Sequence, residues 1–270
     1  MKKIIPFFAL AILISCKEAP KVEKKESAPK PIMAAEKVDN YPASLKKVFD
    51  AHGSVANWKQ YKTLSFQMPK PDGAETHTTD LYSRKEKILA GDVQMGADEN
   101  GIWLWDKKDT YKGDAIFYHN LMFYFYAMPF VLADDGINYG ETQNLEFEGK
   151  SYPGIKISYD AGVGTSPKDE YYLHYEPETH QMAWLGYTVT YRSGEKSDNV
   201  KWIRYNDWTK VGEVQLPKSI SWYTYEGRTI KELRNTMQFN EVALSKMSKP
   251  NTFYTKPADA VYVNKETENK

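Results

Sequence analysis

The residues best suited to acid–base or metal chemistry are five histidines: His52, His77, His119, His174 and His180. None of them forms a metal-ligand spacing with the single cysteine of the chain. Glu176, Glu178 and His180 are close in sequence, but they flank a proline in a segment typical of a strand-to-strand turn, where polar residues are common. The sequence therefore predicts no metal site here, and it indicates no cofactor.

Three other short segments lack the residues that a calcium site, a phosphate-binding loop or a nucleophile motif requires. Asp134-Asp135-Gly136 does not have the spacing of an EF-hand and is typical of a helix end followed by a turn. The glycine-rich segment 162–166 lacks the Lys-Ser/Thr ending of a phosphate-binding loop. A G-x-S-x-G nucleophile motif is missing as well. The sequence predicts a protein that is not an enzyme, with an unrecognised hydrolase as an open alternative.

Aromatic side chains give the strongest remaining signal. Several of them could line a cavity of lipid or glycan size, because ligand pockets are mostly apolar. The same side chains could instead pack together as an ordinary core, and the sequence does not separate these possibilities. The candidate ligand-binding residues are Trp103, Trp105, Phe123, Phe125, Tyr126, Phe130, Trp184, Trp202 and Trp222.

The composition excludes several classes of protein. Aromatic residues make up 14% of the 270 residues and hydrophobic residues 41%, which predicts a folded, β-rich chain. Lys and Arg number 36, as do Asp and Glu, so the chain lacks the positive field that non-specific nucleic-acid binding requires. One cysteine rules out an internal disulfide framework.

The pattern of apolar residues predicts the elements. A helix is expected from Tyr41 to Gly53, followed by a short turn of helix that Ser54 caps. Alternating apolar and polar residues then begin at Thr63 and recur at short intervals as far as Val242. Strands joined by short turns form antiparallel sheets, since parallel strands need crossover helices. We expect a mainly β (α+β) fold, a curved antiparallel sheet or open half-barrel of about ten strands.

One segment departs from this pattern. Residues 121–133 contain no charge and no amide, which fits a buried helix that is too short to cross a bilayer. Pro129 would kink this helix or begin a second one. A helix that is apolar on all sides must be covered on all sides, so we expect the sheet to enclose this segment as a helical plug.

The N-terminus has the features of an export signal. Residues 1–15 combine two lysines with the apolar stretch Ile4–Ile14, as in a signal peptide. Leu13-Ile14-Ser15-Cys16 resembles the lipobox of bacterial lipoproteins, which implies lipidation of Cys16 and a diacylglyceryl membrane anchor. Residues 16–40 are expected to be a disordered tether, residues 41–250 one β-rich domain, and residues 251–270 a C-terminal tail.

Longer segments resemble a known family. The opening YPASLKKVFDAHG, the plug FYHNLMFYFYAMPFVLADDG and the segment LPKSISWYTYEG are similar to a family of Bacteroidota lipoproteins, the domain of unknown function 6503. That family in turn resembles the LolA/LolB lipoprotein-carrier fold, whose members hold acyl chains. The resemblance implies a cell-envelope protein, at the outer membrane, that binds a hydrophobic ligand or assists lipid and lipoprotein traffic. The alternative is a structural or interaction lipoprotein with a self-filled core. Protein partners are not indicated.

Overall fold

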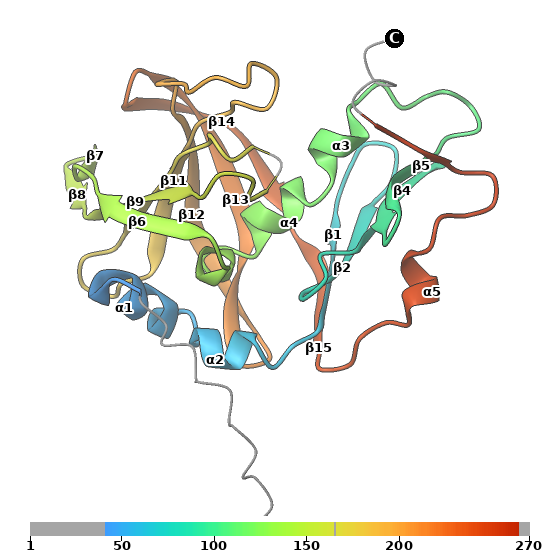
Figure 1. Ribbon diagram of the computed structural model, residues 1–270. Helices are drawn as coiled ribbons and strands as arrows, with labels where there is room; N and C mark the ends of the chain where they lie inside the picture. The colour runs from blue at the N-terminus through green and yellow to red at the C-terminus, as the bar shows by residue number, and fades with distance from the viewer. Residues whose placement is uncertain (1–40, 165, 265–270) are drawn as a thin grey trace, which may run out of the picture. The chain divides into compact units, whose positions relative to one another are not determined.

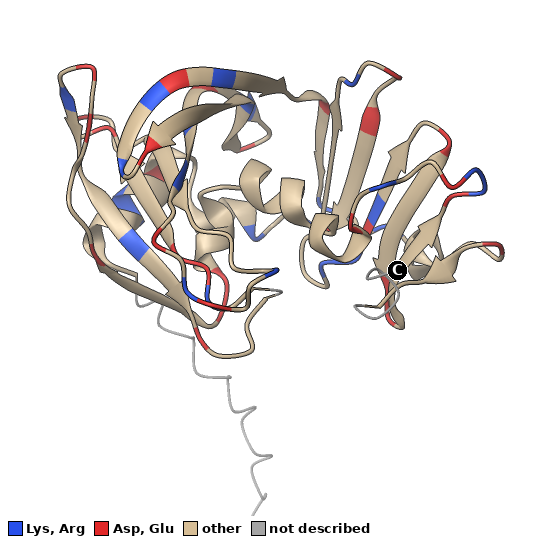
Figure 2. Ribbon diagram, turned by 90° about the horizontal axis from the view of Figure 1, so that it is seen from above, with Lys and Arg blue, Asp and Glu red and all other residues tan. Residues whose placement is uncertain are grey.

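The computed structural model describes residues 41–164 and 166–264, in which two antiparallel sheets flank a helical segment (Figures 1 and 2). The first sheet has the strand order β15-β1-β2-β3-β4-β5-β16, and the second has the order β14-β13-β12-β11-β10-β9-β6. Strands β7 and β8 form a separate hairpin. Every strand pair in these sheets is antiparallel, as the short turns predict.

The bounds of the strands follow chain order. They are β1 (Thr63–Met68), β2 (Glu75–Asp80), β3 (Glu86–Ala90), β4 (Val93–Asp98), β5 (Gly101–Trp105), β6 (Ile137–Glu141), β7 (Leu145–Phe147), β8 (Lys150–Tyr152), β9 (Gly154–Tyr159), β10 (Tyr171–Tyr175), β11 (Met182–Tyr187), β12 (Lys201–Val211), β13 (Val214–Glu226), β14 (Thr229–Gln238), β15 (Asn240–Ser245) and β16 (Val261–Tyr262). The described residues contain more strands than the ten or so expected. Strands β4, β6, β8 and β16 were not predicted, and one strand was expected over residues 235–242, where β14 and β15 meet. The mainly β fold with open, curved antiparallel sheets is confirmed.

The helices are short. They are α1 (Ala43–Ala51), α2 (Val55–Trp58), α3 (Ala115–Tyr118), α4 (Leu121–Tyr126), the 3₁₀ helix η1 (Phe130–Ala133) and α5 (Asn251–Tyr254). Helix α1 ends as predicted, because Gly53 has a φ of +100° and its Cα lies so close to Glu213 that a side chain would clash. The hydroxyl of Ser54 accepts a hydrogen bond from the backbone N–H of Asn57 and caps α2. No helix among the described residues is long and apolar enough to span a bilayer.

One pair of strands joins the two sheets. Strand β14 lies at the edge of the second sheet and β15 at the edge of the first, and only Phe239 separates them in sequence. Phe239 is buried, and its ring centroid lies 5.4 Å from that of Phe66 and 4.3 Å from that of Tyr126. The chain therefore passes from one sheet to the other without a loop, as the long curved strand in Figure 2 shows.

The predicted plug lies between the sheets as α4 and η1, interrupted near Pro129 (Figure 1). Tyr126 packs against Phe66 of the first sheet, and Phe125 packs against Tyr187 of the second. The hydroxyl of Tyr205 donates a hydrogen bond of 2.8 Å to the carbonyl oxygen of Phe125, near the end of α4. One continuous core thus includes residues of both sheets and of the plug.

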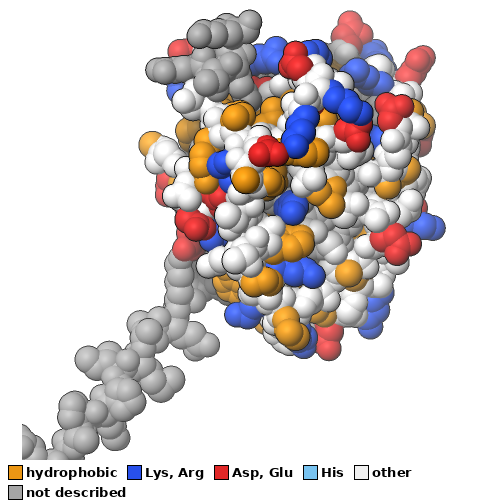
Figure 3. Space-filling view, turned by 90° about the vertical axis from the view of Figure 1, so that its right-hand side faces the viewer, with side chains coloured by type: hydrophobic (Ala, Val, Ile, Leu, Met, Phe, Trp, Pro, Cys, Tyr) orange, Lys and Arg blue, Asp and Glu red, His pale blue; other side chains and the backbone are white. Residues whose placement is uncertain are grey.

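The outer faces of both sheets are also partly covered. Residues 251–262, in the predicted tail, add α5 over the first sheet and β16 to its edge, and Tyr254 is buried there. Hairpin β7–β8 covers part of the second sheet. Figure 3 shows the side of the molecule that carries α5 and β16, where hydrophobic side chains are dispersed among charges of both signs.

Candidate functional site

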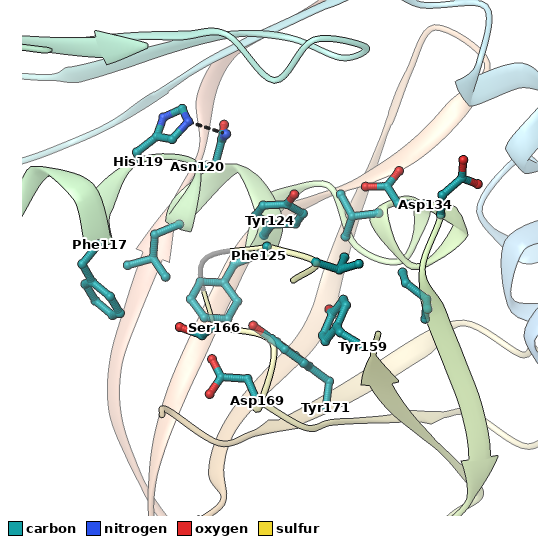
Figure 4. A pocket seen from close by; sticks show the side chains of 16 residues that line it. Phe117, His119, Asn120, Tyr124, Phe125, Asp134, Tyr159, Ser166, Asp169 and Tyr171 are labelled. Carbon is teal, nitrogen blue, oxygen red and sulfur yellow. Dashed lines mark hydrogen bonds between the residues drawn. The ribbon is translucent and has the colours of Figure 1, made fainter. Parts of the chain in front are cut away.

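A cavity of about 350 Å³ lies between the helical segment and strands β6, β9 and β10 of the second sheet (Figure 4). This volume falls within the range of small-molecule sites, about 300–1,000 Å³. Residues of α3, α4 and η1 form one wall, the sheet forms the other, and the loop between β9 and β10 contributes the rest. The described lining residues are Phe117, His119, Asn120, Leu121, Tyr124, Phe125, Val131, Asp134, Asp135, Ile137, Tyr159, Val163, Gly164, Ser166, Asp169 and Tyr171.

The apolar wall comes mainly from the plug. Leu121, Phe125 and Val131 line the cavity from α4 and η1, Ile137 lines it from β6, and Val163 lines it from the loop between β9 and β10. Because the sequence of the plug is apolar on all sides, it can fill the core with one face and still present apolar side chains to a cavity with another. This wall can hold an alkyl chain or a ring without forming hydrogen bonds to it.

Three tyrosines give the cavity an aromatic part. Tyr124 comes from α4, Tyr159 from the end of β9 and Tyr171 from the start of β10. The rings of Tyr159 and Tyr171 meet edge to face, with their centroids 5.7 Å apart. Burial raises the pKa of Tyr159 and of Tyr171 well above the ordinary value for tyrosine, so both hydroxyls remain neutral near pH 7.

Carboxylates supply most of the charge. Asp134 Oδ2 lies 2.5 Å from Arg84 Nη2, so that carboxylate is paired. Asp169 is 8% exposed, and its Oδ1 accepts a hydrogen bond of 2.6 Å from the backbone N–H of Thr190. Burial raises the pKa of Asp169, while the hydrogen bonds from Thr190 lower it in part. Figure 4 shows Asp134 and Asp169 on different sides of the cavity.

His119 and Asn120 form the remaining polar wall. The His119 ring donates from Nδ1 to Glu86 Oε2, 3.2 Å away, and accepts at Nε2 from Asn120 Nδ2, 2.9 Å away. Since both ring nitrogens have partners, the imidazole is held in place and is not available to take a proton from a ligand. Asn120 also donates from Nδ2 to the carbonyl oxygen of Arg84. The described polar groups of this wall are hydrogen-bonded in fixed positions and can orient a bound molecule.

A polar cluster lies behind this wall, on the inner face of the first sheet. His77 is fully buried and lies 2.7 Å from Glu75 (Nε2 to Oε1) and 3.3 Å from Glu86 (Nδ1 to Oε1). The hydroxyl of Tyr118 bonds to Glu75 Oε1 as well. The described residues contain no group of His, Cys, Asp or Glu side chains arranged to hold a metal ion. We therefore treat this cluster as a satisfied ionic network.

Five of the nine predicted ligand-binding residues lie inside the sheets. Phe123, Tyr126 and Phe130 of the plug are at most 1% exposed and belong to the core. Phe125 lines the cavity, and its ring centroid lies 6.2 Å from that of Trp222, which is half-buried on the inner face of β13. The structure thus brings these residues together, although Phe125 alone among the nine borders the cavity described above.

The other four lie away from the cavity, on the outer faces of the sheets. Trp103 is covered by α5 and donates a hydrogen bond from Nε1 to the carbonyl oxygen of Tyr254. Trp105 points to the same face two residues later. Trp184 and Trp202 belong to a second cluster under the β7–β8 hairpin. Burial of these rings strengthens the outer layers of the fold and leaves the cavity unaffected.

Residues that the sequence did not indicate make up most of the cavity. Tyr159, Tyr171 and Asp169 are far in sequence from the plug, and strand pairing alone brings them beside it. The sequence gives little sign of their role, since Tyr159 and Tyr171 are end residues of otherwise ordinary strands and Asp169 lies just before one. Asp134 and Asp135 were noticed only as a turn. The predicted lipidation site, Cys16, lies outside the described residues.

Known proteins were compared with this chain by structure and by sequence. A DUF1329 family protein from Desulfovibrio piger superposes with a TM-score of 0.46 and 8% identity, over 78% of this chain and 97% of the other. A LolA superfamily protein from Nitrosomonas europaea gives a TM-score of 0.45 and 8% identity, over 79% and 96%. No curated protein matches the sequence. The model of a family of unknown function, DUF6503, matches residues 2–236, and the chain belongs to that family.

Proposed function

We propose that this protein is a membrane-tethered lipoprotein of the bacterial cell envelope that binds a hydrophobic ligand in the cavity beside the plug and does no chemistry on it. The observation that carries this proposal is the cavity itself. Its volume of about 350 Å³ and its lining of plug and strand residues fit a small amphiphile or part of an acyl chain.

The polar groups around the cavity support binding rather than catalysis. Both nitrogens of His119 are engaged, and Glu86 behind it is fully buried. General base catalysis needs a group within reach of the proton that it removes. The Nε2 atom of His119, which would have to accept that proton, already accepts a hydrogen bond from Asn120, so the ring serves as a rigid wall for a ligand.

A filling variant tests the proposal. Leu121→Trp replaces a leucine side chain that lines the cavity with a bulky indole ring. The control, Leu89→Trp, makes the same change at a leucine that is 40% exposed on the outer face of β3. We expect an apolar fluorescent dye to bind the wild type and Leu89→Trp equally and to bind Leu121→Trp at least about tenfold more weakly. Mass spectrometry of lipids extracted from the purified protein should show the same order.

A second candidate function follows from how much of the interior the plug fills. Phe123, Tyr126 and Phe130 occupy space that an open carrier would leave empty. In this alternative the protein is a structural or interaction lipoprotein with a self-filled core. Equal and weak dye binding by the wild type and both leucine variants, with no extracted lipid, would favour it.

The membrane anchor is tested separately. We propose that Cys16 is acylated and becomes the first residue of the mature protein, because the lipobox and the apolar leader agree on its position. Cells fed labelled palmitate should label the wild type and should not label Cys16→Ala. Equal label in both would contradict the anchor while leaving the cavity proposal untouched.

A further inference from the structure

The charges that line the cavity are all of one sign. The lining includes three aspartates, and the 16 described lining residues include neither lysine nor arginine. Arg84 approaches from behind and pairs with Asp134. Its other neighbours are the rings of Phe123 and Tyr124. A ligand carrying a carboxylate or a phosphate would therefore meet the Asp169 carboxylate, and the described lining holds no lysine or arginine to balance the ligand's charge. Lys201 acts on Asp169 from outside the lining.

The aromatic part of the cavity suits a cation. The rings of Tyr159 and Tyr171 line the cavity together with Asp169, and Figure 4 shows Asp169 on the side of Tyr171. The charge of Asp169 raises the pKa of both tyrosine hydroxyls, so the carboxylate acts on both rings. A positive group within about 6 Å of the face of such a ring is attracted by the ring's quadrupole, and quaternary ammonium ions are bound by cages of aromatic rings. Arg84 already lies 6.0 Å from the ring centroid of Tyr124, which leaves Tyr159 and Tyr171 as the rings that a ligand would use.

From the charge and the rings together, we propose that the cavity selects a cationic amphiphile, whose ammonium group lies against Tyr159, Tyr171 and Asp169. Its alkyl chain lies against Leu121, Phe125 and Val131 of the plug. This inference rests on the proposed function, because it names the class of ligand that the same cavity takes.

Three probes of equal chain length test the inference in the wild-type protein. Tetradecyltrimethylammonium, tetradecanol and myristate share one alkyl chain and differ in the charge of the head group. The two ionic probes are titrated below their micelle concentrations and the alcohol below its solubility limit, each against a bound apolar dye. We expect the ammonium compound to displace the dye at least about tenfold more effectively than the alcohol, and myristate to be the weakest of the three.

Two variants test whether Asp169 causes the preference for the ammonium compound over the alcohol. Asp169→Asn keeps an oxygen that can accept the hydrogen bond from Thr190, so the fold should be retained while the charge is lost. It should lower the ammonium-to-alcohol preference to about threefold or less, with binding of the alcohol unchanged. The matched control is Asp160→Asn, an exposed aspartate outside the lining, which should keep the full preference.

The outcomes separate the inference from the function on which it rests. If the alcohol or myristate binds as well as the ammonium compound, the inference is wrong and the hydrophobic cavity stands. If Asp160→Asn lowers the preference as much as Asp169→Asn does, overall charge is responsible and the site assignment is wrong. If neither the dye nor any of the three probes binds, the proposed function itself fails.

Discussion

His77 Nδ1 and Glu86 Oε1 lie 3.3 Å apart on neighbouring strands, and neither side chain is exposed to solvent. Burial alone would lower the pKa of His77, but hydrogen bonds and charge from Glu75 and Glu86 raise it. Burial alone would raise the pKa of Glu86, but hydrogen bonds from His119 and His77 lower it to about 2. The interior of the first sheet thus holds an imidazolium between two carboxylates at neutral pH.

Removing the charge of Glu86 should therefore destabilise the protein. Glu86→Gln leaves His77 with one carboxylate instead of two, and breaking a buried pair costs about 3 kcal/mol of unfolding free energy. The lowered pKa of Glu86 determines how its contribution to the unfolding free energy changes with pH. The contribution of Glu86 is fully present above pH 4.5 and is lost as the pH falls toward about 2.

Urea unfolding of Glu86→Gln at pH 7 and at pH 3 measures both effects. The difference from wild type should be large at pH 7 and smaller at pH 3. The control is Glu99→Gln, whose carboxylate pairs with Lys85 at the surface and should leave the urea midpoint unchanged. A midpoint for Glu86→Gln equal to that of wild type would show that the cluster contributes nothing to stability.

His52 should make stability depend on pH in a different range. Burial lowers the pKa of His52 to about 4, and its bond to the carbonyl oxygen of Val48 only partly opposes this. The unfolded chain binds the proton near pH 6.5, so the contribution of His52 is fully present above that pH and is lost as the pH falls to about 4.

The variant His52→Gln cannot take up this proton, so it should not lose the corresponding unfolding free energy as the pH falls. Between pH 7 and pH 4 the wild type should lose up to about 3 kcal/mol more unfolding free energy than the variant does. Urea midpoints at four pH values measure the difference. Curves that run parallel over the whole range would mean that His52 is not buried as a neutral ring.

Two neighbouring phenylalanines should respond differently to truncation. Phe123 is fully buried and does not border the cavity, so Phe123→Ala should cost about 3–5 kcal/mol and leave dye binding unchanged. Phe125 packs against Tyr187 but lines the cavity on its other side, so Phe125→Ala should cost less and should change dye binding. Identical costs with unchanged dye binding in both would place Phe125 in a closed core.

A glycine under Trp103 should tolerate no side chain. A Cβ on Gly96 would lie 2.6 Å from the indole ring and 2.4 Å from the carbonyl oxygen of Glu86. Gly96→Ala should therefore lower the unfolding free energy by about 1–3 kcal/mol. Gly140→Ala, in strand β6, would meet only Lys156 at 4.0 Å and serves as the control. A thermal midpoint for Gly96→Ala equal to that of the control would disprove the close contact.

Many of the strands could be predicted because the alternation of apolar and polar residues along the chain is enough to identify them. Strand β1 begins and ends at the predicted residues, since Leu64, Phe66 and Met68 alternate with polar residues and turn their side chains to the core. Strand β4 was not predicted, although Val93, Met95 and Ala97 alternate along it, because glycine and aspartate, which are uncommon in strands, stand at Gly96 and Asp98. Apolar character without charge was enough to predict that the plug is enclosed.

The cavity could not be predicted in this way, since it depends on which face of a sheet each residue occupies. Trp103 and Trp184 are fully buried, as expected of large aromatic residues, but α5 and the β7–β8 hairpin cover them on the outer faces. A buried tryptophan does not reveal by its type which face it occupies. Asp169 and Tyr159 reach the plug only through the pairing of β9 with β10, which no local pattern encodes.

The strand order of the first sheet has a consequence for how the chain is made. Strands β1 to β5 come from the first half of the chain, whereas β15 and β16, which pair with β1 and β5 at the two edges, come from its last quarter. The first sheet therefore cannot be completed until almost the entire polypeptide has been synthesised. Strands β1 to β5 pair in chain order and can assemble first, but both edges of that partial sheet stay open to other strands until β15 and β16 arrive.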